Sequence, residues 1–385
     1  MNFRFALKNF SLARDAVEKY FTRVSQSPEL RAQGLERLRR GLLADARDYF
    51  QQLARQPIAG PDTAAERGRA LLLLAIITSE TGSLSQAVEL LEEPQAIFEE
   101  LVSQFPDESE YQYRLAQALR FRGEWCRTRE LWRPQQAEPA FDRAIQILGQ
   151  LIRNDSGNRE YRNELARCFH GRGTLQSARG LGDKAKPYLE RALEIREQLA
   201  REDPQNADFQ QGLARTLSMI AFLQTKGDKP DPAQALAKYK RALAIRRRLV
   251  QQNPGLPLYE EQLALGLHNL ATAYLAGEGT PSKEAHQKAA GVYQESRALY
   301  EKLTREHPIV VSYKDSLART LHDLAKEHRA VGRNADAAEV LEKALSLAEQ
   351  LTRDHAGVKA YEVLQADILR DLGKLRGQAE KRLGP

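Results

Sequence analysis

Apolar residues recur along this chain with the spacing of amphipathic helices. In the segment Ala207–Lys226 they fall at intervals of three and four residues, which is the period of one helix face. The stretch GDKPDP then ends that helix, and a second pattern of the same period covers Ala233–Gln252. Nothing along the chain alternates between apolar and polar residues over a length that a strand would need. The pattern therefore predicts an all-α protein built from pairs of helices.

The helix pairs belong to a repeat, because two separate features recur in one register. Both return at intervals of 50, 48, 50, 54 and 48 residues, and an insertion around residues 282–288 explains the longest interval. The first feature is an aromatic residue four positions before Leu-Ala or Gln-Ala, found at Tyr111, Tyr161, Phe209, Tyr259, Tyr313 and Tyr361. The second is a leucine before a polar stretch that usually contains proline, found at Leu101, Leu151, Leu199, Leu249, Leu303 and Leu351. A shared register indicates a tandem array in which neighbouring units bury one another's apolar faces.

Small residues recur at fixed offsets within the units. Gly173 is followed by Ala185, Leu189 and Ala192 at steps of 12, 4 and 3 residues, and a later unit repeats these steps. This small–small–large–small pattern resembles that of the tetratricopeptide-repeat family over about residues 63–383. The resemblance implies a right-handed α-solenoid of helix hairpins, with a groove that binds a protein or peptide partner. Because standard repeats have about 34 residues, we describe these longer units as extended tetratricopeptide-like hairpins.

The N-terminal stretch, residues 2–53, resembles the connector that opens the repeat region in large bacterial serine/threonine protein kinases. We therefore predict an N-terminal helical connector or capping region at residues 1–56, followed at residues 57–385 by an array of about six units of 48–54 residues. The chain lacks the Gly-rich phosphate loop, the His-Arg-Asp motif and the Asp-Phe-Gly motif of a kinase. The resemblance thus implies an alternative function, a sensor or regulatory repeat segment of kinase signalling.

The first helices of the units carry a stripe of basic residues. Each first helix carries one Gly or Ala of the repeat pattern, and we compare the residues three and six positions before it. Eight of these twelve residues are Arg or His. The composition of the chain alone predicts about two basic residues among twelve. Two further arginines follow this Gly or Ala by four positions. The predicted groove residues are Arg120, Arg127, Arg167, His170, Arg215, His268, Arg319, His322, Arg329 and Arg370.

Guanidinium groups bind carboxylates and phosphates through paired hydrogen bonds. We therefore expect a non-catalytic scaffold that holds an acidic peptide or protein partner in a basic groove. The alternative explanation of the stripe is duplication. Each arginine would then be inherited from one ancestral unit and neutralised by a carboxylate of the neighbouring unit.

Composition limits the other classes of function. The longest uninterrupted apolar run, Ala70–Ile77, has eight residues, so we expect no transmembrane helix. No signal peptide is recognisable either. We therefore expect a cytoplasmic protein, unless the chain is part of a membrane-anchored parent protein. Neither metal-ligand spacing nor a nucleophile motif is present, so we expect no metal, no cofactor and no enzymatic activity. A net charge of +6 allows nucleic-acid binding without implying it, and we keep this function as a third alternative behind the other two. Self-association is an alternative use of the last helix, Ala360–Leu375, which no following unit covers.

Two further features concern the core. Trp125 and Trp132 are seven residues apart, which on a helix places both indoles on one face, and we expect them to pack between units. Cys126 and Cys168 are too few for a disulfide framework, and we expect half-buried helix cysteines.

Overall fold

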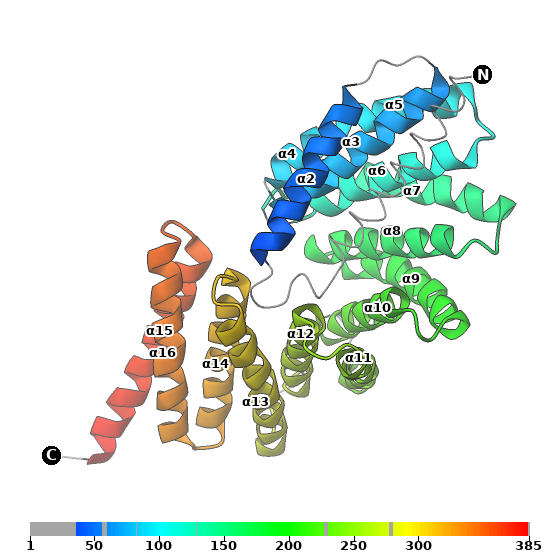
Figure 1. The fold of residues 1–385 in the computed structure, drawn as a ribbon. Coiled ribbons are helices and arrows are strands. Elements are labelled where there is room, and N and C mark those ends of the chain that lie inside the picture. Colours follow the sequence, from blue (N-terminus) through cyan, green and yellow to red (C-terminus); the bar gives the residue numbers. More distant parts are fainter. Residues whose placement is uncertain are drawn as a thin grey trace. The chain divides into compact units, whose positions relative to one another are not determined.

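The computed structural model describes residues 36–55, 60–81, 83–128, 130–226, 230–276 and 280–383. All regular elements within these ranges are helices (Figure 1). The chain divides into two compact units, residues 1–216 and 217–385, which we call unit 1 and unit 2. The division falls within one helix, α10 (Ala207–Lys226). The predicted connector lies outside the described residues except for 36–55, and its boundary with the array at residue 56 stays a prediction.

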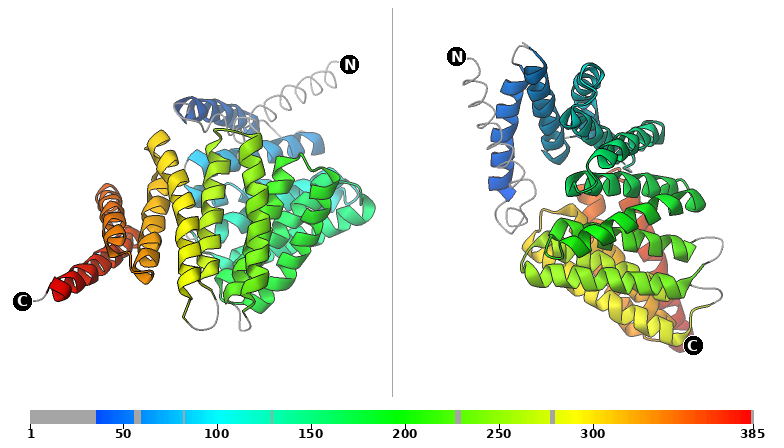
Figure 2. Two further views of the ribbon diagram at one scale, coloured as in Figure 1. Left: turned by 90° about the horizontal axis from the view of Figure 1, so that it is seen from below. Right: turned by 90° about the vertical axis from the view of Figure 1, so that its right-hand side faces the viewer.

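Unit 1 consists of helices that pack in chain order. Its first hairpins contain α2 (Glu36–Ala54), α3 (Pro61–Thr81), the short α4 (Leu84–Glu89) and α5 (Glu92–Gln104). They are followed by α6 (Ser109–Cys126), α7 (Pro134–Asn154), α8 (Arg159–Ala178) and α9 (Gly182–Glu202). Each of α6 to α8 packs on the next helix along the chain, and Figures 1 and 2 show the antiparallel course of these pairs.

Unit 2 repeats this plan. Its helices after α10 are α11 (Pro232–Gln252), α12 (Pro257–Tyr274), α13 (Lys283–Glu306), α14 (Val311–Ala330), α15 (Asn334–Asp354) and α16 (Lys359–Leu383). Consecutive helices again pack on one another from α11 to α16. Stacked helix hairpins in both units confirm the predicted all-α solenoid of extended tetratricopeptide-like units, in which the even-numbered helices α6 to α16 are the first helices and the odd-numbered α7 to α15 the second.

Short polar signals begin and end these helices. The side chain of Asn158 accepts hydrogen bonds from the backbone N–H groups of Glu160 and Tyr161 and so caps the start of α8. Gly180 after α8 and Gly332 after α14 have φ angles of 76° and 85°. Only glycine adopts this left-handed conformation without steric cost, which allows the sharp turn into the second helix.

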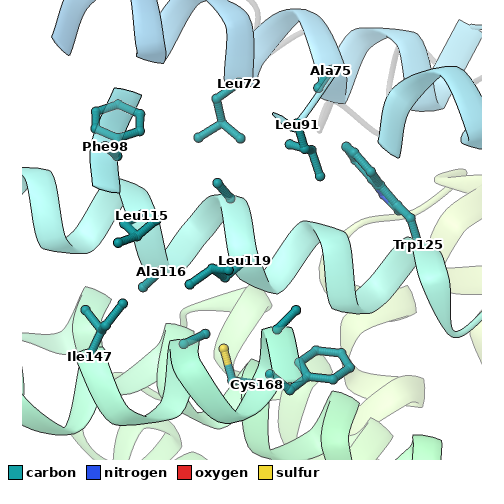
Figure 3. Close-up of a cluster of buried hydrophobic side chains, with 14 of the residues drawn as sticks. Leu72, Ala75, Leu91, Phe98, Leu115, Ala116, Leu119, Trp125, Ile147 and Cys168 are labelled. Carbon is teal, nitrogen blue, oxygen red and sulfur yellow. The ribbon is translucent and has the colours of Figure 1, made fainter. Parts of the chain in front are cut away.

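The small residues of the repeat allow close contact between the helices of a hairpin. A Cβ atom at Gly173 would lie 2.7 Å from Cγ of Leu189, and one at Gly123 would lie 2.8 Å from the ring of Phe141. The predicted packing of a small residue against a large one therefore occurs between α8 and α9. The same principle fills the core of unit 1, where Phe98, Leu115, Leu119 and other apolar side chains interlock (Figure 3).

Two expectations about the core are wrong. Helix α6 ends at Cys126, so Trp125 is buried in the core whereas Trp132 lies in the following loop with a φ of 38° and 41% of its surface exposed. The two indoles therefore do not share a helix face. Cys126 and Cys168 are fully buried and not half-buried. None of the helices in the described ranges combines the length and the hydrophobicity that crossing a bilayer demands.

Candidate functional site

The ten predicted groove residues divide equally between the two units. In unit 1, Arg120 and Arg127 belong to α6 and its C-terminal cap, Arg167 and His170 to α8, and Arg215 to the first part of α10. We define the arginine cluster as five arginines and the three carboxylates close to them: Arg120, Arg127, Arg167, Arg196 and Arg215 with Glu124, Glu164 and Asp208.

Two arginines of the cluster pair with carboxylates of the following repeat. The buried Arg120 on α6 forms an ion pair with the buried Glu164 on α8. Arg167 on α8 reaches Asp208 on α10, with 2.7 Å between Nη2 and Oδ2, and it also lies 3.5 Å from Glu164. These contacts match the alternative explanation of the stripe, in which carboxylates of neighbouring repeats neutralise its charges.

The third pair lies within one helix. Nε of Arg127 donates a 2.9 Å hydrogen bond to Glu124, three residues earlier on α6. Burial alone would raise the pKa of Glu124, but the guanidinium groups of Arg127 and Arg120 outweigh burial and hold this pKa below its ordinary value. Glu124 is therefore ionised and fixes the position of Arg127.

Arg196 was not among the predicted residues, because it lies on the second helix α9. Its side chain is 2% exposed, and Nη1 donates to the carbonyl of Gly212 at 2.7 Å and to the hydroxyl of Thr216. Within the described part of the chain it forms no ion pair, and its buried Nε has no hydrogen-bond partner. Burial, reinforced by the positive charges of Arg215 and Arg167, lowers the pKa of Arg196 to about 9. A guanidinium without an ion-pair partner among the described residues is thus held inside the cluster, where Asp208 and Glu124 are the carboxylates that favour its charge.

His170 is the neutral member of this neighbourhood. It is buried, and its Nδ1 lies 3.3 Å from the Thr216 hydroxyl. Burial holds the pKa of His170 well below 6.5, and the positive charges of Arg196, Arg215 and Arg127 lower it further. The imidazole is therefore uncharged at neutral pH and does not add to the positive charge of the site.

Arg215 differs from the other arginines because it is exposed and unpaired. No hydrogen bond or ion pair joins it to any residue that the structure describes. Desolvation nevertheless lowers the pKa of Arg215; the negative charge of Glu124 raises it, and the positive charge of Arg167 lowers it. The exposed guanidinium remains charged, because arginine keeps its proton at physiological pH. The cluster thus has five guanidinium groups against three carboxylates, an excess of two positive charges.

In unit 2 the predicted residues all have carboxylate partners. The carboxylate of Asp371 on α16 pairs with two of them, His322 through Nε2 at 3.1 Å and Arg329 through Nη1 at 3.5 Å. The other three pairs join His268 to Asp323 at 3.5 Å, Arg319 to Asp315 at 2.9 Å and Arg370 to Asp367 at 2.6 Å. Burial lowers the pKa of both His268 and His322. The stripe is therefore balanced in unit 2 and carries its excess positive charge in unit 1.

The described residues offer little for metal or thiol chemistry. Within their ranges, His, Cys, Asp and Glu side chains nowhere gather in groups of three or more that could hold a metal ion. Burial raises the pKa of the Cys126 thiol and, more strongly, that of Cys168. A buried thiol with a raised pKa is a poor nucleophile.

Comparisons with known proteins support the repeat assignment. Residues 140–192 match the family model described as a tetratricopeptide repeat. No curated protein matches the chain. Among solved structures, one of the nuclear import adaptor Nro1 is 16% identical, with 84% of this chain and 97% of that chain covered and a TM-score of 0.51. A second, of S. pombe Nro1, is also 16% identical, with 80% and 99% covered and a TM-score of 0.49. A tetratricopeptide-repeat protein from Thermus thermophilus is 17% identical, with 66% and 98% covered and a TM-score of 0.36. At such identities the likeness to Nro1 shows the fold alone, and the chain is shown to carry tetratricopeptide-like helical repeats.

Proposed function

We propose that this protein is a non-catalytic interaction scaffold that binds an acidic peptide or protein partner at the arginine cluster of unit 1. The observation that carries the proposal is Arg215, an exposed arginine without a partner among the described residues, in a cluster with excess positive charge. A guanidinium presents five N–H donors in a planar fork, and these match the two oxygens of a carboxylate. Repeated helix hairpins support the same function, since such arrays present extended surfaces to other proteins.

The predicted groove residues have different parts in this proposal. Arg215 contacts the partner directly, and the half-exposed Arg127 and Arg167 flank it. Arg120 and His170 are buried and hold consecutive first helices together. In unit 2, His268, His322 and Arg329 pair with carboxylates of the following repeat, whereas Arg319 and Arg370 pair within their own helices. We do not assign these residues to the partner.

The kinase-associated alternative rests on the N-terminal resemblance alone. Most of that stretch lies outside the described residues, and the same repeat fold would serve both functions. The arginine cluster would then be the part of a sensor segment that recognises its partner.

Selection from a random peptide library displayed on phage tests the proposal. We expect the full-length protein to enrich peptides rich in Asp and Glu, and Arg215→Glu to abolish this enrichment because it reverses the charge at the contact. The matched control is Arg191→Glu on α9, because the Arg191 side chain is 69% exposed and its ion pair is with Glu194, three residues later on the same helix. Acidic enrichment that survives Arg215→Glu, or enrichment of peptides without acidic residues, would overturn the proposal.

A further inference from the structure

Arg196 occupies a buried position that four of the other repeats fill with apolar side chains and one fills with a second arginine. In the register of the repeat it corresponds to Phe98, Leu148, Arg246, Tyr300 and Ala348, all of which are buried. An uncompensated charge at a core position costs stability relative to an apolar side chain of similar size. Packing alone therefore does not explain Arg196. The second arginine of the series, Arg246 in unit 2, packs against Gly266 on the next helix, where a Cβ atom would lie 2.5 Å from its Nη1. Arg196 differs from it in having the exposed Arg215 on the helix that it contacts.

The contacts of Arg196 place its charge beside Arg215. Its Nη1 binds the Gly212 carbonyl and the Thr216 hydroxyl on α10, and Thr216 directly follows Arg215 in sequence. Gly212 makes this approach of α9 possible, because a Cβ atom there would lie 3.1 Å from Nε of Arg196. The positive charge of Arg196 thus lies close behind the surface on which Arg215 is exposed.

The charge of the cluster favours an anion with two negative charges. Glu124, Glu164 and Asp208 are each paired with at least one of Arg120, Arg127 and Arg167. Arg196 and Arg215 form no ion pair with a carboxylate among the described residues, and the nearest carboxylates that act on them, Glu124 and Asp208, are already paired with other arginines. A carboxylate ligand would compensate one of these two charges. A phosphomonoester carries a charge of about −1.5 to −2 at pH 7 and offers three acceptor oxygens.

We infer that the arginine cluster of unit 1 binds a phosphomonoester, such as a phosphorylated side chain of the partner, in preference to a carboxylate. This inference rests on the proposed function and specifies the chemistry of the acidic group. Arg215 donates hydrogen bonds to the phosphate oxygens, while Arg196 stabilises the second negative charge from within the protein. The same chemistry would also accept free inorganic phosphate, so the test compares the two sources.

Isothermal titration of the full chain at fixed ionic strength tests the inference. The probes are N-acetyl-O-phosphoserine amide, N-acetyl-glutamate amide and inorganic phosphate. We expect the phosphoserine derivative to bind about tenfold more tightly than the glutamate derivative, because of its second charge and additional acceptor oxygens. Arg215→Ala and Arg196→Leu should each weaken its binding by about tenfold, whereas Arg191→Ala should leave it unchanged.

The outcomes separate this inference from the proposed function. Equal affinities for the phosphoserine and glutamate derivatives would overturn the inference, even if phage selection still enriches acidic peptides through Arg215. Unchanged phosphate binding in Arg215→Ala would overturn it as well, and this variant does not depend on replacing a buried side chain. If inorganic phosphate binds as tightly as the phosphoserine derivative, the chemistry is supported and free phosphate is its source. Phosphate binding without any selected acidic peptide would support the inference and overturn the binding of unphosphorylated acidic peptides that the proposed function expects.

Discussion

His170 on α8 and Thr216 on α10 are in hydrogen-bond contact, with 3.3 Å between Nδ1 and Oγ1. Unit 2 contains the same contact, because Nδ1 of His268 on α12 lies 3.2 Å from Oγ1 of Thr320 on α14. In each case the histidine belongs to one repeat and the threonine to the next, so the contact joins two consecutive first helices. Part of the predicted basic stripe is therefore a joint between repeats.

Replacing the threonine of this joint by valine removes its hydroxyl while keeping its shape. We expect Thr216→Val to lower the free energy of unfolding by about 1–3 kcal/mol, because both His170 and the buried Arg196 lose a hydrogen-bond partner. Thr320→Val is the matched control and should cost less, since His268 is only partly buried and retains Asp323. Urea titration of both variants measures the difference. If both variants lost the same free energy of unfolding, the hydrogen bond between Thr216 and Arg196 would not contribute to stability.

Burial of His170 also predicts how stability depends on pH. Its pKa in the folded protein is well below 6.5, so the unfolded chain takes up a proton first as the pH falls. Stability is therefore retained above about pH 6.5 and decreases below it, by up to about 1.4 kcal/mol per pH unit for one such histidine. Arg196, Arg215 and Arg127 are the charged groups that oppose its protonation. In His170→Gln the slope between pH 6.5 and pH 5 should be shallower than in the wild type, and an identical slope would assign the effect to other groups.

The helix pairs could be predicted from the sequence because the repeat displays them several times. The segment predicted at Ala207–Lys226 coincides with α10, and the predicted Ala233–Gln252 differs from α11 by one residue. The position of Trp132 could not be predicted in this way. Its loop leaves the helical period directly after Cys126, and no other repeat has an indole there.

The candidate site was predicted in part. Counting basic residues on the first helices located Arg215 but could not show that Arg120 is paired, because its partner Glu164 lies 44 residues further along the chain. Arg196 was missed since only first helices were considered. Its signal was nevertheless present in the sequence, as a charged residue in a register position that holds Leu148 one repeat earlier.

The close contact of α8 with its neighbours predicts that a side chain at one glycine, Gly171, would destabilise the fold. A Cβ atom at Gly171 would lie 2.5 Å from the ring of Phe141 and 2.8 Å from Oε1 of Glu124. We expect Gly171→Ala to destabilise the protein by about 1–3 kcal/mol through overpacking. Gly149→Ala in α7 is the control, because its Cβ atom would meet nothing closer than Arg153 at 4.0 Å. Gly149→Ala should raise the melting temperature slightly, as alanine favours a helix. A decrease in melting temperature of equal size in both variants would exclude the steric explanation.

Two buried arginines of the cluster should respond in opposite ways to the same substitution. Arg196→Leu places an apolar side chain where Leu148 lies in the preceding repeat, and we expect unchanged or increased stability, by on the order of 1 kcal/mol. Arg120→Leu leaves Glu164 buried with only the longer contact to Arg167, and it should cost about 2–4 kcal/mol.

Thermal and urea unfolding of the two variants, side by side, measure this contrast. An increase in stability for Arg196→Leu, together with its loss of phosphate affinity, would mean that the arginine is retained for binding at the expense of stability. Strong destabilisation of Arg196→Leu would instead make its hydrogen bonds to Gly212 and Thr216 structural, and the buried charge would then be explained by the joint between α9 and α10.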